Sequence, residues 1–408
     1  MAALILPLGS IIGIILLTKI AGKARSFEKF TVPEILGDRY GPSARLLSVI
    51  ALVIAYMVIV SYQYNAGGAV LKTILTDPGG NSLISVETGT IIAAIFIIAY
   101  TMLAGLVSVA YTDVANGIII LFSFIIAIPI FLAEAGGLSG MAASFDAMGK
   151  PEHMNFWGVY STMDIINFCL PSFLLIMGDA NMYQRFFASK DAEGAKSATK
   201  VLIFAVALAE LMIIVSAWIV SSMIPDAEVG KYVLIYASHK FLPTFLGAIM
   251  MTTIVGIIIS TADSYLLVPA TTLMRDIYLN YINPNADEKK IVFLSRVLVL
   301  ILGIVAYIVS LGFAKSAGFF ERALYAYTIY GAAITPSLVA ALFWKGATKQ
   351  GAIASILTGT VTTLLWKEAG FIRNIIPANV YNNMDEVLPA ITLSVVSLVV
   401  VSLLTKKD

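Results

Sequence analysis

The sequence alternates between long apolar runs and short clusters of charged or turn-forming residues. The apolar runs extend over roughly 18 to 27 residues, and about 20 apolar residues in a helix are enough to cross the hydrocarbon core of a bilayer. Turn-forming clusters such as Asp77-Pro78-Gly79-Gly80 and Asn283-Pro284-Asn285 favour chain reversal between them. We therefore predict about eleven membrane-spanning helices, near residues 2–20, 45–71, 89–106, 108–134, 163–184, 200–223, 243–275, 291–314, 322–344, 350–367 and 387–405.

The composition agrees with this pattern. Of the 408 residues, 59% are hydrophobic and 12% are charged, whereas about 25% of the residues of an average soluble protein are charged. These values exclude a soluble enzyme, a secreted domain and a nucleic-acid-binding protein. They predict an all-α polytopic membrane protein, organised as a single transmembrane domain over residues 1–408.

Sequence motifs for enzymatic chemistry are missing. The chain has no P-loop, GxSxG, HExxH or GxGxxG motif, which excludes energy coupling by ATP hydrolysis in this chain. The single cysteine, Cys169, excludes an intramolecular disulfide and a multi-thiolate metal site. We therefore expect no enzyme activity, no cofactor and no nucleic-acid partner. The lipid bilayer is the expected partner, and the oligomeric state stays open.

The distribution of basic residues predicts the orientation in the membrane. Eight of the 26 Lys and Arg residues fall on one predicted face: Lys72, Lys150, Lys231, Lys240, Lys315, Arg322, Lys367 and Arg373. The remaining 18 fall on the other face, which the excess of positive charge assigns to the cytoplasm. We therefore predict a plasma-membrane protein with a cytoplasmic C-terminus and, after eleven spans, an extracellular N-terminus.

An extracellular N-terminus is unusual for the segment Met1-Ala2-Ala3-Leu4-Ile5-Leu6-Pro7. This segment has neither a basic region nor a cleavage-site pattern, so it does not read as a signal peptide. A signal-anchor helix of reversed orientation is one explanation. We favour the other, in which helices that belong upstream are missing and the chain is truncated at its N-terminus.

Four acidic residues lie well within the apolar runs: Asp113, Asp179, Glu210 and Asp263. The sequence places no Lys or Arg beside them. A charged side chain in the bilayer interior costs about 2.5–3.5 kcal/mol on insertion scales, so each acid is a candidate functional residue. Such acids either stay protonated or neutralise a bound cation. Asp113 and Asp179 can also be solvated helix caps near the cytoplasmic face.

The seventh predicted helix combines oxygen-bearing side chains with one of these acids. Its segment Gly256-Ile257-Ile258-Ile259-Ser260-Thr261-Ala262-Asp263-Ser264 places four such side chains within five residues. Hydroxyl groups in a helix often donate to the carbonyl four residues earlier, which accounts for one or two of them. The cluster as a whole indicates a site for a hard cation such as Na⁺, which prefers oxygen ligands. Proton binding is the competing explanation.

The fifth and ninth predicted helices contain residues that interrupt helices. Pro171 and Gly178-Asp179 lie in the fifth, and Gly331 to Pro336 lie in the ninth. Proline removes a backbone donor, and broken helices at membrane depth are tolerated where they line a cavity. Kinked structural helices are the alternative. We expect the breaks near Pro171 and Gly331 to contact a solute, together with Gln63 and Asn65 in the second helix.

Four segments together resemble the sodium:solute symporter family of sodium–glucose, sodium–proline and sodium–pantothenate cotransporters. Thr31-Val32-Pro33-Glu34 to Arg39-Tyr40-Gly41 is similar to the family's TxPExLxxRYG loop. Ala104-Gly105-Leu106 to Tyr111-Thr112-Asp113 resembles its GGLxxVxYTD signature, although Ala104 replaces the first glycine. Gln184-Arg185 to Lys190-Asp191 resembles QRxxAAKD, and Ile259 to Ser264 with Arg275-Asp276-Ile277-Tyr278 resembles STADS…RDIY.

The resemblance implies a leucine-transporter-like fold of inverted repeats, with solute and cation at the midplane. It implies a first, incomplete repeat at 1–134, a second at 163–344 and extra helices at 350–408, with the first two family helices lacking. It also implies that the Ile257 carbonyl and the Ser260 and Thr261 hydroxyls bind sodium. In some members Asp113, Asp263 and Ser264 would form a second cation position.

The leading functional prediction is a sodium-coupled symporter that imports a small organic solute, such as an amino acid or a monocarboxylate, by alternating access. Na⁺ would act as the coupling ion. A proton-coupled transporter is the first alternative. A non-transporting sensor-like protein and an inactive truncated family member are the others.

Overall fold

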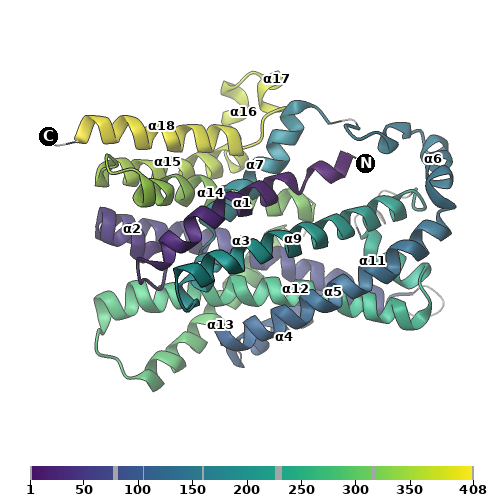
Figure 1. Ribbon diagram of the computed structural model, residues 1–408, viewed down its shortest axis with the longest axis horizontal. Helices are drawn as coiled ribbons and strands as arrows, with labels where there is room; N and C mark the ends of the chain where they lie inside the picture. Colours follow the sequence, from purple (N-terminus) through teal and green to yellow (C-terminus); the bar gives the residue numbers. More distant parts are fainter. Residues whose placement is uncertain are drawn as a thin grey trace.

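The computed structural model describes residues 2–76, 81–103, 105–158, 160–225, 232–313 and 318–406, and the described residues fold into a bundle of long helices that run side by side (Figure 1). In chain order the long elements are α1 (Leu8–Arg25), α3 (Pro42–Ile74), α4 (Val86–Leu103), α5 (Leu106–Glu134), α7 (Thr162–Gly178) with α8 (Ala180–Ala188), α9 (Ala192–Ser221), α12 (Thr244–Thr272) with its π-helical continuation η3 (Leu273–Ile282), α13 (Glu288–Phe313), α14 (Phe319–Phe343), α15 (Lys349–Glu368) and α18 (Val387–Thr405).

Short helices connect these elements. They are η1 (Ala2–Ile5), α2 (Val32–Tyr40), α6 (Gly137–Ala147), η2 (Pro151–Met154), α11 (Val233–Lys240), α16 (Ile372–Ile375) and α17 (Ala378–Tyr381). The turn expected at Asn283 follows the end of η3, as predicted. The turn expected at Asp77 to Gly80 lies outside the described residues.

Nine of the described helical segments are long and apolar enough to span a bilayer. The other two predicted spans are the helices α1 and α15. Both carry three charged residues, Lys19, Lys23 and Arg25 in α1 and Lys349, Lys367 and Glu368 in α15. In α1 the three charges fall within only 18 residues, and α15 adds five hydroxyl side chains to its end charges, so neither helix is among the nine apolar segments.

The centre of the bundle is α3, which packs against α4, α12, α13 and α14. Tyr56 and Tyr64 of α3 and Tyr330 of α14 are fully buried there. A second apolar cluster around Phe124, Phe131 and Phe145 joins α5 and α6 to α9, α11 and the start of α12. These contacts place α5, α8 and α12 next to one another around the predicted cation residues.

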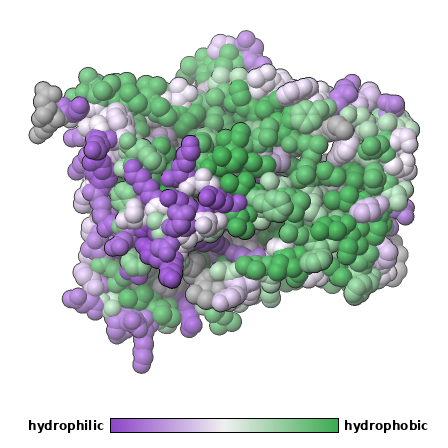
Figure 2. Space-filling view, viewed as in Figure 1, coloured by the Kyte–Doolittle hydropathy of each residue, from purple (hydrophilic) through white to green (hydrophobic). Residues whose placement is uncertain are grey.

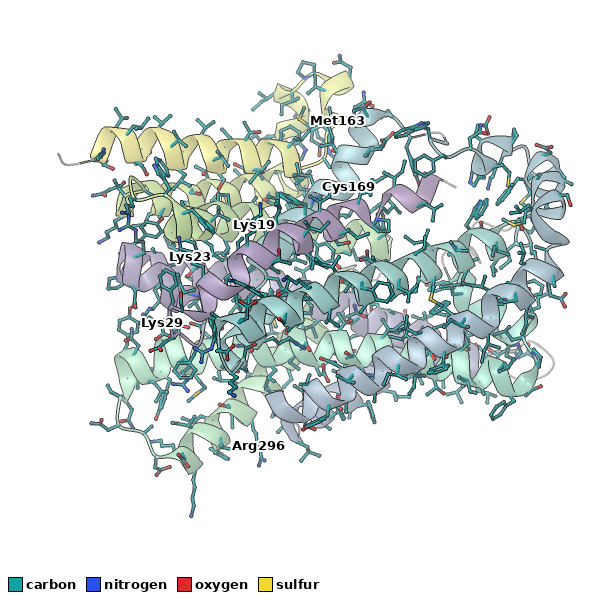
Figure 3. All side chains as sticks on the ribbon, viewed as in Figure 1. Lys19, Lys23, Lys29, Met163, Cys169 and Arg296 are labelled. Atoms are coloured by element: carbon teal, nitrogen blue, oxygen red, sulfur yellow. The ribbon has the colours of Figure 1, made fainter. Side chains whose placement is uncertain are left out.

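Hydrophilic residues gather at the left end of the view in Figure 2, over α2 and the neighbouring helix ends. Lys19, Lys23, Lys29 and Arg296 lie toward this end in Figure 3. These four residues belong to the face on which the sequence places 18 basic residues. Their common location therefore agrees with that grouping.

Two of the family-like segments bind each other at this end. Thr31 caps α2 by accepting from the backbone N–H of Glu34, and its hydroxyl donates to Oδ2 of Asp276 at 2.7 Å. The other oxygen of Asp276 faces Nε of Arg45 at 3.5 Å. Asp38 pairs with Lys29 at 2.5 Å, and this hydrogen bond raises the pKa of the Lys29 ammonium. The loop around α2 is thus fixed to the end of η3.

Candidate functional site

The predicted break in the fifth helix lies between α7 and α8. Ser161 and Asp164 form a capping box that starts α7, and the helix runs without interruption through Pro171 to Gly178. Asp179 leaves the helical conformation, with φ −58° and ψ 109°, and its side chain caps α8 by accepting from the Asn181 N–H at 3.1 Å. The break near Gly178 is confirmed, whereas the chain at Pro171 is helical.

Side chains from other helices satisfy the carbonyl groups at this break. The Tyr330 hydroxyl donates to the Gly178 carbonyl at 2.8 Å, and the Tyr183 hydroxyl donates to that of Met177 at 3.3 Å. Thr335 donates to the Leu174 carbonyl, one turn before Gly178, at 2.7 Å. Carbonyls at a helix end need such partners when water is excluded. Hydrogen bonds from neighbouring helices therefore stabilise the break.

Asp179 is buried at this break, with 1% of its surface exposed. The Tyr56 hydroxyl donates to Oδ1, and the Tyr265 hydroxyl donates to Oδ2 at 3.4 Å. The ring of Tyr56 packs against Tyr265 with centroids 4.7 Å apart and against Tyr330 at 5.3 Å. Within the described part of the chain, Asp179 forms no ion pair. We call Asp179 with Tyr56, Tyr265 and Tyr330 the Asp179 cluster.

The expected break in the ninth helix is absent, and that prediction is wrong. α14 is one continuous helix from Phe319 to Phe343 with Pro336 inside it. Proline removes the donor for the carbonyl four residues earlier, which belongs to Ala332. That carbonyl faces Gly359 of α15, where an added Cβ would come within 2.4 Å of it. α14 thus stays helical through Pro336 and packs closely against α15 at this carbonyl.

Four of the predicted sodium residues gather around Arg185 of α8, two of them bound to it directly. The guanidinium Nη2 lies 2.6 Å from Oδ2 of Asp113 and donates to the Ser264 hydroxyl at 3.3 Å. The Ser260 hydroxyl donates to Oδ1 of Asp113. The prediction that no basic residue accompanies the membrane acids is thus wrong for Asp113. Arg185 is remote from it in sequence, and the two meet because α5, which carries Asp113, and α8, which carries Arg185, both pack against α12.

The remaining predicted sodium residues lie on the same stretch of α12. The Thr261 hydroxyl donates to the Ile257 carbonyl at 2.9 Å, which is the local bond that hydroxyls in helices often make. Asp263 is 1% exposed, and neither of its carboxylate oxygens has a hydrogen-bond partner among the described residues. Asp263 is therefore the buried acid of this group that lacks a partner. We call Asp113, Arg185, Ser260, Asp263 and Ser264 the Asp263 cluster.

A family model described as the sodium:solute symporter family matches residues 1–359 of this chain. The chain belongs to the sodium:solute symporter family. The resemblance inferred from the four segments is thereby confirmed. The protein is a multi-pass membrane transporter and not an enzyme, and sodium-coupled symport of a small solute is its function.

Curated relatives of this symporter include proline transporters. The osmoregulated proline transporter OpuE of Bacillus subtilis is 25% identical, over 93% of this chain and 75% of that protein. The high-affinity proline transporter PutP of the same organism is 27% identical, over 92% and 77%. The sodium/proline symporter of Haemophilus influenzae is 24% identical, over 95% and 78%.

The fold is also found in a solved structure, that of a Na⁺-coupled sialic acid symporter in a substrate-bound outward-open state. The two structures align with a TM-score of 0.72 over 98% of this chain and 83% of the other, at 14% sequence identity. The predicted leucine-transporter-like fold is confirmed by this likeness.

The four residues predicted to contact solute occupy different places in the symporter. Gln63 is half-buried, and Asn65 donates to the Ser310 carbonyl of α13 at 3.3 Å. Pro171 is buried within α7. Gly331 lies against α7, where an added Cβ would be 2.6 Å from Cβ of Leu174. The structure does not bring these four into one group.

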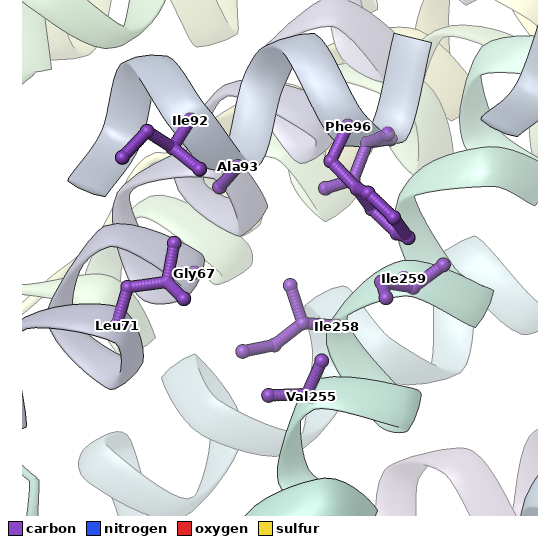
Figure 4. Close-up of a pocket in the computed structure, with 9 residues that line it drawn as sticks. Gly67, Leu71, Ile92, Ala93, Phe96, Val255, Ile258 and Ile259 are labelled. Carbon is purple, nitrogen blue, oxygen red and sulfur yellow. The ribbon is translucent and has the colours of Figure 1, made fainter. Parts of the chain in front are cut away.

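A cavity of about 250 Å³ lies between α3, α4 and α12 (Figure 4). Its lining is apolar and includes Gly67, Ala93 and Ile258. Ile92 and Phe96 at its edge are 45% and 54% exposed on the outside of the bundle. Because no polar group lines it, this cavity is unsuited to a charged or polar solute.

Sequence reasoning missed Arg185 and the tyrosines of the Asp179 cluster as site residues. Arg185 lies in the QRxxAAKD-like segment, and this motif was the sequence feature that could have identified it as a site residue. Tyr56 and Tyr265 lie in apolar runs where tyrosine is indistinguishable from ordinary core residues. Only the packing of α3 and α12 around the break brings their hydroxyl groups into contact with Asp179.

Proposed function

We propose that this symporter imports proline, or a small amino acid very similar to it, together with Na⁺. The relatives that are named proline transporters or sodium/proline symporters align with more than nine-tenths of this chain, which supports proline over a sugar or an organic acid without an amine. The observation that carries the proposal is the Asp179 cluster. Its buried carboxylate has hydroxyl partners but no cationic one among the described residues.

This chemistry fits the ammonium group of an amino acid. A buried carboxylate binds a cationic donor strongly because the local dielectric constant is low. The aromatic faces of Tyr56, Tyr265 and Tyr330 add attraction for a cation. The three rings also cover Asp179, so the solute would reach it only when they move. Such movement is what alternating access requires.

We infer that the Asp263 cluster, with the Ile257 carbonyl and the Thr261 hydroxyl, is the sodium side of the transporter. Arg185 neutralises Asp113, whereas Asp263 forms no ion pair among the described residues. Its carboxylate, once ionised, provides the negative charge that a bound cation would neutralise. The Thr261 hydroxyl donates to Ile257 but keeps its lone pairs for a cation. Hydroxyl, carbonyl and carboxylate oxygens are the ligands that a hard cation prefers.

The finer topology is also a proposal. We infer that 1–134 and 163–344 are inverted repeats, that 350–408 is an addition, and that the C-terminus is cytoplasmic in a plasma membrane. The gathering of Lys19, Lys23, Lys29 and Arg296 at one end of the molecule supports this orientation.

The experiment is uptake of radiolabelled proline into liposomes that contain the purified symporter. We expect uptake to require an inward sodium gradient and to be competed by small amino acids but not by glucose or sialic acid. In D179N the asparagine still caps α8 but has no charge, so KM for proline should rise at least about tenfold, since a charge-assisted bond is worth about 1.5–3 kcal/mol.

Asp191→Asn is the matched control because Asp191 also caps a helix, α9, at an exposed site. It should leave KM unchanged. Proline uptake that persists without a sodium gradient, or a D179N variant with the wild-type KM, would contradict the proposal.

A further inference from the structure

Glu210 lies at the middle of α9 and belongs to neither cluster described above. It is the single charged residue between Lys200 and Ser221. Ten residues separate it from Lys200, which is about 15 Å along a helix. Its side chain is half-buried and contacts α1. An isolated acid at this depth in the membrane is stable only if it pairs with another group or carries a proton.

Its partner is the hydroxyl of Ser10, which is buried in the first turn of α1. Ser10 Oγ lies 2.9 Å from Oε1 and 2.9 Å from Oε2 of Glu210, and also 2.9 Å from the carbonyl oxygen of Pro7. A serine hydroxyl has one hydrogen to donate. The contacts to Glu210 and to Pro7 can therefore both be full two-centre hydrogen bonds only when the carboxyl group carries a proton, because otherwise the two acceptors share one hydrogen.

In that arrangement Glu210 donates to Ser10, and Ser10 donates to Pro7. If Glu210 is ionised, the carboxylate and the Pro7 carbonyl compete for the single hydrogen of Ser10, and the bond to Pro7 is weakened. Burial away from water disfavours the ionised form in addition. Geometry and solvation thus favour the same protonation state.

No other group compensates the charge of Glu210 within the described residues. The elements packed against α9 are η1, α1, α5, α8 and α11. Their titratable or charged groups are Lys19, Lys23, Arg25, Tyr111, Asp113, Glu134, Tyr183, Arg185, Tyr236, His239 and Lys240. Tyr327 of α14 is near enough to sense the charge of Glu210. None of these groups forms an ion pair or a hydrogen bond with Glu210 in the described chain.

We propose that Glu210 and Ser10 form a proton-binding site between α9 and α1, separate from the Asp263 cluster. The neutral acid links the two helices through Ser10 to Pro7. Loss of the proton weakens this link and leaves a charge at the helix interface, so α1 and α9 separate more easily at alkaline pH. The site makes the transporter sensitive to pH without using the groups assigned to sodium or to the solute.

The test is infrared spectroscopy of the purified full chain between mildly acidic and mildly alkaline pH. We expect a carbonyl band of a protonated carboxylic acid that disappears as the pH rises. E210Q should lack the band, and S10A should keep it at a shifted frequency because its hydrogen bond is lost. E193Q is the control, since Glu193 is an exposed acid of the same helix, and its spectrum should match the wild type.

A second measurement is the dependence of thermal stability on pH. Wild-type stability should fall as the pH rises through the titration of the band. In E210Q this fall should be smaller, because its amide can donate to Ser10 at any pH. Identical titrating bands in wild type and E210Q would overturn the proposal. If E210Q does not fold, an unshifted band in S10A would overturn it. These readouts need no transport, so they are independent of the solute.

Discussion

Individual residues of the Asp263 cluster divide into paired and unpaired charges. Asp113 is held by Arg185 and Ser260, whereas the carboxylate oxygens of the buried Asp263, on α12, have no hydrogen-bond partner in the part of the chain that the structure describes. Removing the carboxylate of Asp113 leaves the half-buried guanidinium of Arg185 without its ion-pair partner, which costs stability. Removing an unpaired carboxylate removes only its contribution to a bound cation. Substitution of Asp113 therefore tests the ion pair with Arg185, whereas substitution of Asp263 tests the binding of a cation.

We expect Asp263→Asn and Thr261→Val to weaken sodium binding while expression stays normal. The first removes the net negative charge, and the second removes one neutral oxygen worth about 1 kcal/mol, which is about fivefold in affinity. The measurement is the sodium concentration for half-maximal uptake.

Thr363→Val is the control for Thr261→Val, because the buried hydroxyl of Thr363 in α15 makes the same bond to a carbonyl four residues earlier. It should leave the sodium dependence unchanged. If uptake by the unaltered protein follows pH and ignores sodium, the coupling ion is a proton, and Asp113, Asp263 or Glu210 carries it.

Helices of this bundle approach one another closely where glycines face backbone atoms. An added Cβ would lie 2.1 Å from the Cys169 carbonyl at Gly9, 2.6 Å from Leu174 at Gly331 and 2.4 Å from the Ala332 carbonyl at Gly359. In a bilayer, association of helices relies on such packing because lipid is as apolar as the side chains. The contact of α7 with α14, which holds the break at Asp179, is of this kind.

Gly178→Ala tests that contact. The new Cβ would lie 2.3 Å from Oγ1 of Thr335 and 3.3 Å from its Cβ, so we expect a loss of about 1–3 kcal/mol in the free energy of unfolding, typical of overpacking. In a Thr335→Ala background the loss should be smaller because the clashing oxygen is gone. Gly312→Ala, where nothing lies within 4 Å, should cost nothing. Additive effects of the Gly178 and Thr335 substitutions in denaturant unfolding would refute this contact.

Hydrophilic residues gather toward one end of the molecule, where Lys19, Lys23, Lys29 and Arg296 lie, and hydrophobic residues cover much of the rest of the face in view (Figures 2 and 3). At the basic end, Thr31 and Arg45 bind Asp276, so the α2 loop and the η3 end belong to one interface. A bilayer that meets this molecule would surround the apolar surface and leave the basic end in water.

This arrangement predicts which residues a membrane-impermeant thiol reagent can reach. Starting from Cys169→Ser, we expect Lys290→Cys and Lys345→Cys to be labelled from the cytoplasmic side and Lys240→Cys from the opposite side. All three lysines are exposed. Labelling of positions 290 and 345 from opposite sides would overturn the predicted topology.

Local patterns in the sequence were sufficient for the helices and for the position of the break. Apolar runs of bilayer length follow from the cost of burying charge, and Gly178-Asp179 combines a residue without Cβ with one that caps helices well. The grouping of oxygen-bearing side chains on α12 was also predictable, because Ser260, Thr261, Asp263 and Ser264 are near neighbours on one helix, while their role in cation binding stays a prediction.

Contacts between distant segments were decided only by the tertiary structure. Arg185 reaches Asp113, Ser10 reaches Glu210, and Tyr56 reaches Asp179 across helices that the sequence separates by more than seventy residues. Pro336 is the converse case. The local sequence around it predicts a break, yet α14 is continuous there and packs closely against Gly359 of α15. Local sequence determines where each helix begins and ends and which side chains it carries, because backbone conformation and hydrophobicity depend on a few neighbouring residues. The pairing of a buried charge depends on which helices pack together, and that is a property of the whole fold.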